Sequence, residues 1–201
     1  MEALTTKAER TRQLIIERAA HLFNQKGYAG TSMHDIMTTT GLTKGGIYGH
    51  FESKEDIALA AFDYASNHLI RLISDKLARN TSASEKLNTL LDFYRTYISA
   101  PPIMGGCPVL NTSVEADDTN PLLRAAVVKV LNKLHKAVSN IVKLGIEQQE
   151  FKANADAERF AVLFVSMIEG GIMVSKAYGD TKHLEIVLQH LTQIIGQELK
   201  V

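Results

Sequence analysis

The single cysteine of this 201-residue chain is its most reactive side-chain type. Cys107 lies in the sequence Gly-Gly-Cys-Pro, and Pro108 is of the type favoured in the first turn of a helix, which would make Cys107 the N-cap. There the backbone N–H groups and the helix dipole favour a thiolate, which reacts with electrophiles and oxidants. The alternative is a small, buried, unreactive side chain. One cysteine makes no internal disulfide, which fits a reducing cytoplasm.

The histidines offer a second possible chemistry, metal binding or proton transfer. They lie at positions 21, 34, 50, 68, 135, 183 and 190. No pair has HExxH spacing, and no Glu precedes a His by three residues, so the spacings of common zinc and di-metal carboxylate sites are missing from the sequence. We therefore predict no metal, no cofactor and no catalytic residue. A small helical enzyme using Cys107 and His135 is the less favoured alternative.

A third group of residues could bind phosphates. Residues 43–50 read Thr-Lys-Gly-Gly-Ile-Tyr-Gly-His. Each glycine costs up to about 1 kcal/mol inside a helix, so three glycines in five residues need a reason. Close approach of the backbone to a DNA surface is one such reason. Thr43 and Lys44 would stand at a helix N-terminus, where N–H groups and a cation both attract phosphate oxygens.

Long helices on either side of one irregular segment must position these residues. All four prolines lie between positions 101 and 121, and no convincing strand alternation occurs. An apolar fraction of 45% and a charged fraction of 22% are typical of a folded soluble chain. We predict an all-α protein of about nine helices. Seven of the expected helices cover about 5–25, 43–51, 53–78, 84–100, 121–149, 156–177 and 182–199. Two short helices are also expected, one that starts at Thr31 or Ser32 and ends before Gly41, and one that has Pro108 in its first turn.

The first three helices form a helix-turn-helix pattern, with Gly41 in the turn and the third helix free to enter a major groove. Ser32 with Asp35 resembles a capping box at the start of the second helix. Residues 1–51 carry six basic and four acidic side chains in a chain of zero net charge, so nucleic-acid binding must come from a local cluster. Four apolar residues are predicted to form the core of this unit: Ile36, Leu42, Ile47 and Phe51.

The run GYAGTSMHDIMTTTGLTKGGIYGHFESKEDI, residues 27–57, resembles the DNA-binding signature of TetR-type (tetracycline-repressor-like) transcriptional regulators. The resemblance extends over residues 7 to about 60. It implies that Thr5, Lys7 and Arg10 brace the DNA backbone. His50 could equally be a packing residue, whereas Tyr48 is expected to contact phosphate, with a half-buried core position as the less favoured alternative. The DNA-binding residues that it implies are Thr31, Ser32, Thr43, Lys44, Gly45, Tyr48, His50 and Lys54.

The C-terminal part contains candidates for a small-molecule pocket. Aromatic and methionine side chains with Asn111 and Glu115 as polar groups match the composition of such pockets, although each residue could equally be ordinary core. The segment GGCPVLNTSVEADD also resembles one branch of TetR-type regulators, some of which respond to reactive compounds. The predicted ligand-binding residues are Phe93, Tyr97, Met104, Cys107, Asn111, Phe164 and Met167.

The last two helices carry wide apolar stripes, which favour a four-helix contact with a second copy of the chain. TetR-type regulators dimerise through their last two helices, so the resemblance implies the same. The alternative is that both stripes complete the core of one chain. The predicted dimer residues are Phe164, Ile168, Leu184, Leu188, Leu191 and Ile195.

Together these patterns predict a helix-turn-helix domain at residues 1–52 and an effector-binding and dimerisation domain at residues 53–201, with 53–80 as the connecting helix. We predict a ligand-released repressor that binds an inverted-repeat operator in double-stranded DNA as a homodimer. A regulator that senses electrophiles through Cys107 is the alternative. The least polar stretch, residues 160–174, is shorter than the roughly 20 residues of a membrane span, so we predict a cytoplasmic protein without a membrane partner.

Overall fold

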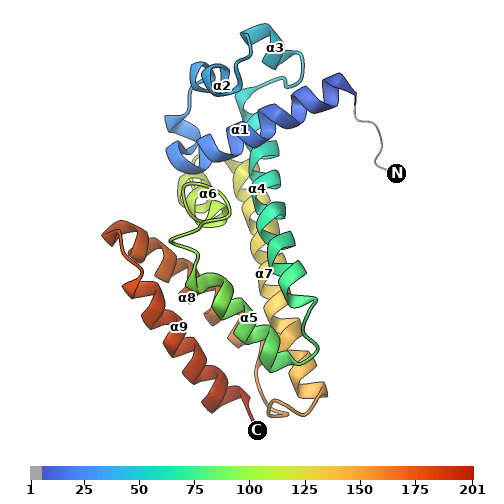
Figure 1. Cartoon of the computed structure of the whole chain (residues 1–201), viewed down its shortest axis with the longest axis vertical. Coiled ribbons are helices and arrows are strands. Elements are labelled where there is room, and N and C mark those ends of the chain that lie inside the picture. The colour runs from blue at the N-terminus through green and yellow to red at the C-terminus, as the bar shows by residue number, and fades with distance from the viewer. Residues whose placement is uncertain (1–5) are drawn as a thin grey trace. The chain divides into compact units, whose positions relative to one another are not determined.

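The computed structural model describes residues 6–201, which fold into α-helices joined by short connections (Figure 1). These residues form nine α-helices and a last π-helical turn, and they contain no β-strand. One isolated bridge pairs Phe151 with Lys200. The prediction of an all-α fold with about nine helices is confirmed for this part of the chain.

The chain divides into two compact units. Unit 1 comprises Met1–His68 and Ile103–Val127, and unit 2 comprises Leu69–Pro102 and Val128–Val201. The predicted division after residue 52 therefore differs from the division into compact units. The reason is that α6 (Pro108–Ala116) packs against the first helix and joins the N-terminal helices in unit 1.

Unit 1 contains the helix-turn-helix. Its elements are α1 (Lys7–Gly30), α2 (Met33–Thr40), α3 (Lys44–Tyr48), α6, and the first parts of α4 (Lys54–Leu77) and α7 (Pro121–Glu147). The predicted capping box is present at α2, where the Ser32 hydroxyl accepts from the Asp35 backbone N–H at 3.1 Å. Gly41 ends α2 with φ of 71°, a left-handed conformation that glycine adopts without strain. Thr43 caps α3 by accepting from the Gly46 N–H at 3.2 Å.

The end of α1 differs from the prediction. The helix was predicted to end at about residue 25, but helical structure continues to Gly30. Gly27 itself breaks the helix, with φ of 76° and ψ of 170°. The left-handed conformation turns the chain without ending the helical segment, which sequence patterns do not distinguish from a C-terminal cap.

The core of unit 1 lies between α1, α2, α3 and α4. Ile36, Ile47 and Phe51 are buried in it, as predicted, and Leu42 packs against it while partly exposed. A short α3 of five residues is marginal alone, so the buried Ile47 holds it in place.

Unit 2 contains α5 (Ala83–Arg95), α8 (Ala157–Tyr178), α9 (Lys182–Ile194) and the π-helical turn η1 (Ile195–Leu199), with the later parts of α4 and α7. In Figure 1, α8 and α9 lie side by side, and α9 also packs against α5. α5 is shorter than the predicted 84–100, because residues after Arg95 form turns rather than helix.

The most apolar helix of the described chain is α8. An 18-residue window within it has a mean hydropathy of 1.6, and 44% of that window is buried inside the chain. By length and composition alone α8 could cross a membrane, but a single such helix is weak evidence, because core helices of soluble proteins pass the same test.

Candidate nucleic-acid interface

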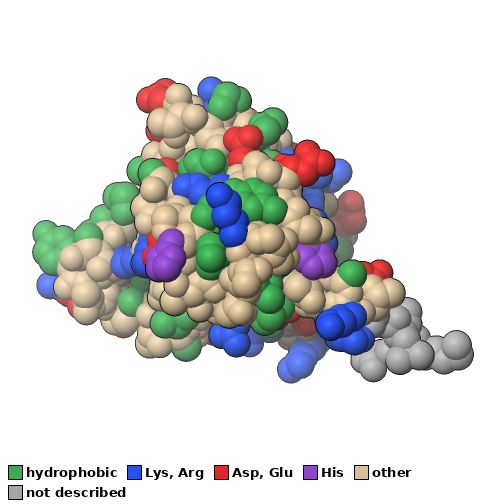
Figure 2. Space-filling model, turned by 90° about the horizontal axis from the view of Figure 1, so that it is seen from above, with side chains coloured by type: hydrophobic (Ala, Val, Ile, Leu, Met, Phe, Trp, Pro, Cys, Tyr) green, Lys and Arg blue, Asp and Glu red, His purple; other side chains and the backbone are tan. Residues whose placement is uncertain are grey.

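The exposed face of α3 brings four of the predicted DNA-binding residues together. Thr43, Lys44, Gly45 and Tyr48 are all exposed, with Tyr48 at 41%. The Lys44 ammonium lies 5.8 Å from the centre of the Tyr48 ring, which is within reach of a cation–π contact. Figure 2 views the molecule from above, where basic, acidic and histidine side chains are scattered over a largely uncharged surface.

Gly45 has no packing role within the chain. A Cβ atom built at this position would meet nothing within 4 Å. Its backbone φ is not in the left-handed region that favours glycine. Since neither space nor conformation requires glycine, alanine would fit the chain and stabilise the helix. The absence of a side chain at Gly45 therefore matters for binding at this surface and not for the folding of the chain.

Thr31 is a correction to the prediction. Its side chain is completely buried, and its hydroxyl donates to the Gly27 carbonyl at 2.7 Å. A buried and bonded hydroxyl does not reach a phosphate, so the predicted DNA contact of Thr31 is wrong. Its position beside the exposed Ser32 in the sequence motif gives no indication of this difference.

Lys54 holds the polypeptide before α2. Its ammonium donates to the Tyr28 carbonyl at 2.6 Å and to the Thr31 carbonyl at 2.7 Å, and it lies 4.2 Å from the centre of the Tyr28 ring. These contacts use two of the three N–H donors. The predicted phosphate contact of Lys54 stays a prediction. Only the third N–H group of its ammonium could donate to a phosphate.

The N-terminus of α2 already carries a carboxylate. Asp35 accepts from the Ser32 hydroxyl at 2.5 Å, from the Ser32 N–H at 2.8 Å and from the Lys26 ammonium at 2.7 Å. The hydrogen bond from Lys26, followed by those from Ser32, holds the pKa of Asp35 well below its ordinary value. The predicted phosphate contact of Ser32 remains a prediction, and its hydroxyl proton is committed to Asp35.

Replacing Asp35 with asparagine is expected to lower the melting temperature at pH 7. Because folding lowers the pKa of Asp35, the charged form stabilises the fold above the unfolded value, near 3.8, and this contribution is lost as the pH falls toward the folded value. Circular-dichroism melts of Asp35→Asn and wild type between pH 7 and pH 3 should therefore show a difference that shrinks below about pH 4. A difference that is constant over this range would contradict a role for the charge.

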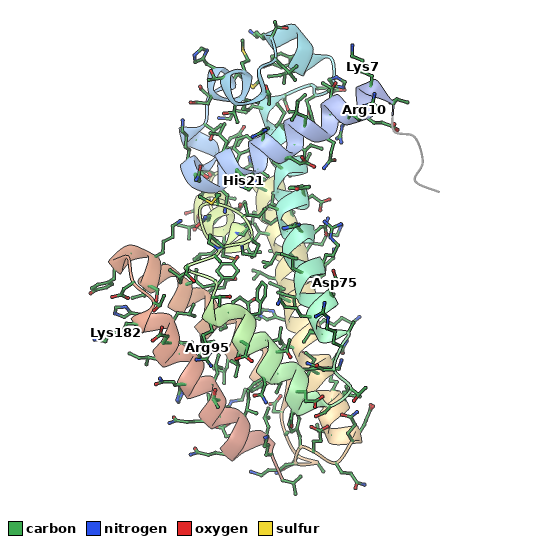
Figure 3. The ribbon with its side chains drawn as sticks, in the orientation of Figure 1. Lys7, Arg10, His21, Asp75, Arg95 and Lys182 are labelled. Atoms are coloured by element: carbon green, nitrogen blue, oxygen red, sulfur yellow. The ribbon has the colours of Figure 1, made fainter. Side chains whose placement is uncertain are left out.

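The remaining predicted contacts flank α3. His50 is half-buried, so its two predicted roles both stay open. Lys7 and Arg10 are exposed on the first turns of α1 (Figure 3). Thr5 lies outside the described residues.

Sequence reasoning named Glu115 only as a polar group of a pocket and missed its contact with α1. Its carboxylate accepts from the backbone N–H groups of Tyr28 and Ala29, each at 2.6 Å, directly after the break at Gly27. A side chain at Gly27 would meet this carboxylate at 2.8 Å. Burial, followed by the Glu55 and Glu115 charges, raises the pKa of Tyr28 and keeps its phenol neutral.

A second contact joins α1 to α6 through two asparagines. The Asn111 amide donates to the Asn24 side-chain oxygen at 2.9 Å, and the Asn24 amide donates to the carbonyls of Met104 and Gly106 at 3.0 and 2.9 Å. In Figure 3, His21 lies on the same part of α1, and its Nδ1 accepts from the Met104 N–H at 3.3 Å. These contacts join residues 80 to 87 positions apart, and no local sequence signal indicates them.

The predicted ligand-binding residues belong to both units. Phe164 and Met167 lie on α8 in unit 2, where Phe93 and Tyr97 form edge contacts within an aromatic cluster. Met104, Cys107 and Asn111 lie in unit 1. Of the seven predicted residues, only Asn111 lines the cavity of about 290 Å³ in unit 1.

Cys107 is the N-cap of α6 with Pro108 in the first turn, as predicted, but only 2% of it is exposed. A reagent in solution has little access to such a thiol. The structure therefore favours the alternative of a small buried side chain over a reactive thiolate.

The six predicted dimer residues need a second correction. All of them are buried inside a single chain, which leaves them no surface for a second copy. The prediction selected the stripes of α8 and α9 that pack against each other and against α5. The residues whose predicted dimer contact is corrected are Phe164, Ile168, Leu184, Leu188, Leu191 and Ile195.

A different face of α8 is exposed. It carries Val162, Ser166, Met173 and Ala177, which we call the α8 outer stripe. Val162 and Met173 are each 51% exposed and stand eleven residues, or three helical turns, apart on the same side. Gly170, beside this stripe, has nothing within 4 Å of a built Cβ atom.

Among residues 6–201, no group of three or more His, Cys, Asp and Glu side chains is arranged to hold a metal ion. This part of the structure gives no candidate for a metal centre.

Comparison with protein families gives two matches. A model described as "Bacterial regulatory proteins, tetR family" matches residues 15–61. A model described as "Tetracyclin repressor-like, C-terminal domain" matches residues 83–191, more than half of the chain.

Comparison with individual proteins covers nearly the whole chain. It is 42% identical to a TetR transcriptional regulator from Chloroflexus aurantiacus J-10-FL, over 97% of this chain and 98% of that one, with a TM-score of 0.93. It is 37% identical to a TetR-family regulator from Cytophaga hutchinsonii, over 99% of both chains, with a TM-score of 0.92. It is 24% identical over 165 residues to the HTH-type transcriptional repressor DhaR of Mycobacterium sp. (strain GP1), which is 82% of each chain.

Proposed function

Because the chain belongs to the TetR family of bacterial regulatory proteins, it is a DNA-binding transcription regulator and not an enzyme, and we propose that it is a ligand-released repressor. The relative DhaR is a repressor by name, which supports this mode of action. Since its target is DNA, we expect the protein to act in the cytoplasm.

The proposal that α3 enters the major groove rests on the residues of its exposed face. Thr43 and Lys44 offer a hydroxyl and a cation beside the bare backbone of Gly45, and the buried Ile47 anchors the helix from behind. Phosphate contacts of this kind set position and affinity, whereas base contacts set the sequence. Glycine at position 45 allows the backbone to approach DNA more closely than any other residue would.

A homodimer would form through the α8 outer stripe. α8 combines the highest hydropathy of the described helices with a half-exposed window, and exposed apolar surface of this kind marks an interaction site. Gly170 would let the partner helix approach closely. Two α3 helices one DNA turn apart, about 34–36 Å, would read an inverted repeat.

Release by a small molecule requires that the molecule bind the DNA-free conformation more tightly than the DNA-bound one. A molecule with equal affinity for both conformations would leave their populations unchanged. The cavity in unit 1 and the aromatic cluster in unit 2, which contains predicted ligand-binding residues, both support an effector site.

The decisive experiment measures the binding of the purified chain to duplex DNA from the region flanking its own gene. Fluorescence anisotropy at 50–300 mM salt is expected to give an affinity that falls steeply with salt, with two chains per duplex and about 10³-fold preference over unrelated DNA. A strictly monomeric chain without salt-sensitive duplex binding would overturn the proposal.

Lys44→Ala is expected to weaken binding to specific and unrelated duplexes by a similar factor, because a lysine that neutralises a phosphate carries no sequence information. The slope of log affinity against log salt should fall by about 1, which the same anisotropy series measures. An unchanged slope would place Lys44 away from the DNA. Lys129 on α7 is an exposed control, and Lys129→Ala should leave the slope as it is.

A further inference from the structure

Unit 1 contains a cavity of about 290 Å³ between α1, α4, α6 and the start of α7. This volume is at the lower end of the range for small-molecule sites, roughly 300–1,000 Å³. Alanines at positions 58, 61 and 65 of α4 leave the space open, and Phe23 and Phe62 supply flat apolar walls. The cavity therefore suits a compact, largely apolar molecule.

The charge of the cavity wall restricts the ligand further. Glu115 is the one carboxylate among the residues that line it, and no lysine, arginine or histidine of the described chain does so. A second carboxylate, Glu55, accepts from the lining residue Asn120 at 2.9 Å. An anion would therefore enter an unfavourable field, whereas a cation would find a partner in Glu115.

Glu115 also holds the segment that leads into the helix-turn-helix. Its two oxygens accept from the N–H groups of Tyr28 and Ala29, four and three residues before Ser32, the N-cap of α2. Lys54 binds carbonyls of the same segment from α4. A cation that pairs with Glu115 would compete with the two N–H groups and loosen the α6 side of this attachment.

We propose that the unit 1 cavity binds a compact apolar molecule carrying one positive charge, which pairs with Glu115 in place of the N–H groups of Tyr28 and Ala29. The binding site stands on the geometry of the cavity, while its consequence for DNA rests on the proposed function. The ligand would release DNA where the contacts of Glu115 with Tyr28 and Ala29 are tighter in the DNA-bound conformation, because a population shift needs a difference in affinity between the two conformations.

Three matched probes test the site on the full chain without DNA. 4-Phenylbutylamine, 4-phenylbutanol and 4-phenylbutanoate share one apolar body and differ in the charge of the head group. Isothermal titration calorimetry is expected to show the amine binding at least 10-fold tighter than the alcohol, and the acid binding weakest. Equal affinities, tighter binding of the acid, or no binding of the amine would overturn the proposal.

Variants locate the site. Glu115→Gln should bring the affinity for the amine down to that for the alcohol, while the alcohol still binds. Thr112→Phe, which places a ring into the cavity wall, should abolish binding of both. Val114→Phe is the matched control, since Val114 lies on the same helix, is 67% exposed and does not line the cavity, and it should bind as wild type does. Equal effects of the two phenylalanine variants would overturn the assignment.

The same amine added to the duplex complex separates this inference from the proposed function. If the amine binds in calorimetry and releases DNA from wild type but not from Thr112→Phe, both the cavity site and the proposed release of DNA by a ligand are supported. If it binds without releasing DNA, the cavity stands as a site and its regulatory role is wrong. If duplex binding is salt-sensitive while the amine does not bind, the cavity proposal alone fails.

Discussion

Gly45→Glu is expected to reduce the affinity for operator DNA at least about 100-fold without unfolding the protein. The position is exposed and has free space around it, so the chain accommodates the new side chain. Against DNA, the same side chain adds bulk and a negative charge, and like charges at an interface cost several kcal/mol, where each 1.4 kcal/mol is a factor of ten. Anisotropy measures the affinity, and circular-dichroism melts check the fold.

Two further variants separate charge from proximity. Val114→Glu adds the same charge on exposed α6 and should leave the affinity within about 3-fold of wild type. Gly45→Ala should raise the free energy of unfolding by up to about 1 kcal/mol and yet weaken DNA binding. Opposite signs for stability and affinity are the result expected only if the bare backbone touches DNA. A Gly45→Ala variant that binds DNA as well as wild type would contradict the close approach.

The second large effect is expected from charges in the α8 outer stripe. Val162→Glu combined with Met173→Glu should convert the dimer into a monomer, because two carboxylates would have to be buried at the dimer contact without partners. A monomer holds a single half-site, so operator affinity should fall at least about 100-fold. Sedimentation velocity measures the mass, and anisotropy measures the affinity.

Val128→Glu is the matched control, since Val128 is an exposed valine of unit 2 on α7. It should leave both the dimer and operator binding unchanged. A double variant that remains a dimer would show that a different surface joins the two copies. A wild-type chain that is monomeric at all concentrations would contradict the proposed dimer altogether.

Local signals predicted most of the helices and their starts. Ser32, Thr43 and the pair Cys107–Pro108 begin the helices that they were expected to begin. Such signals are reliable because a cap satisfies N–H groups within a few residues of itself. The end of α1 was predicted at about residue 25, because a glycine with positive φ such as Gly27 can end a helix or only kink it.

Apolar periodicity predicted that α8 and α9 pack, but the residues assigned to a contact with a second copy are buried within the chain. Both helices bury one stripe inside their own chain, and α8 leaves another exposed. Hydrophobicity has no direction, so a pattern along one helix does not distinguish its own core from a second copy. The same limit applies to Thr31 and Lys54, whose types suit phosphate contacts although the fold uses them within the chain.

By itself, the sequence determined the class of the protein: an all-α regulator whose glycine-rich α3 follows a capped turn. These features depend on contacts within about five residues, which composition and spacing record. Only the tertiary structure decided that α6 joins the N-terminal helices, that Glu115 holds Tyr28 and Ala29, and that alanines of α4 leave a cavity beside them. Those contacts span more than eighty positions for Glu115, and their energies depend on how whole helices pack rather than on any local pattern.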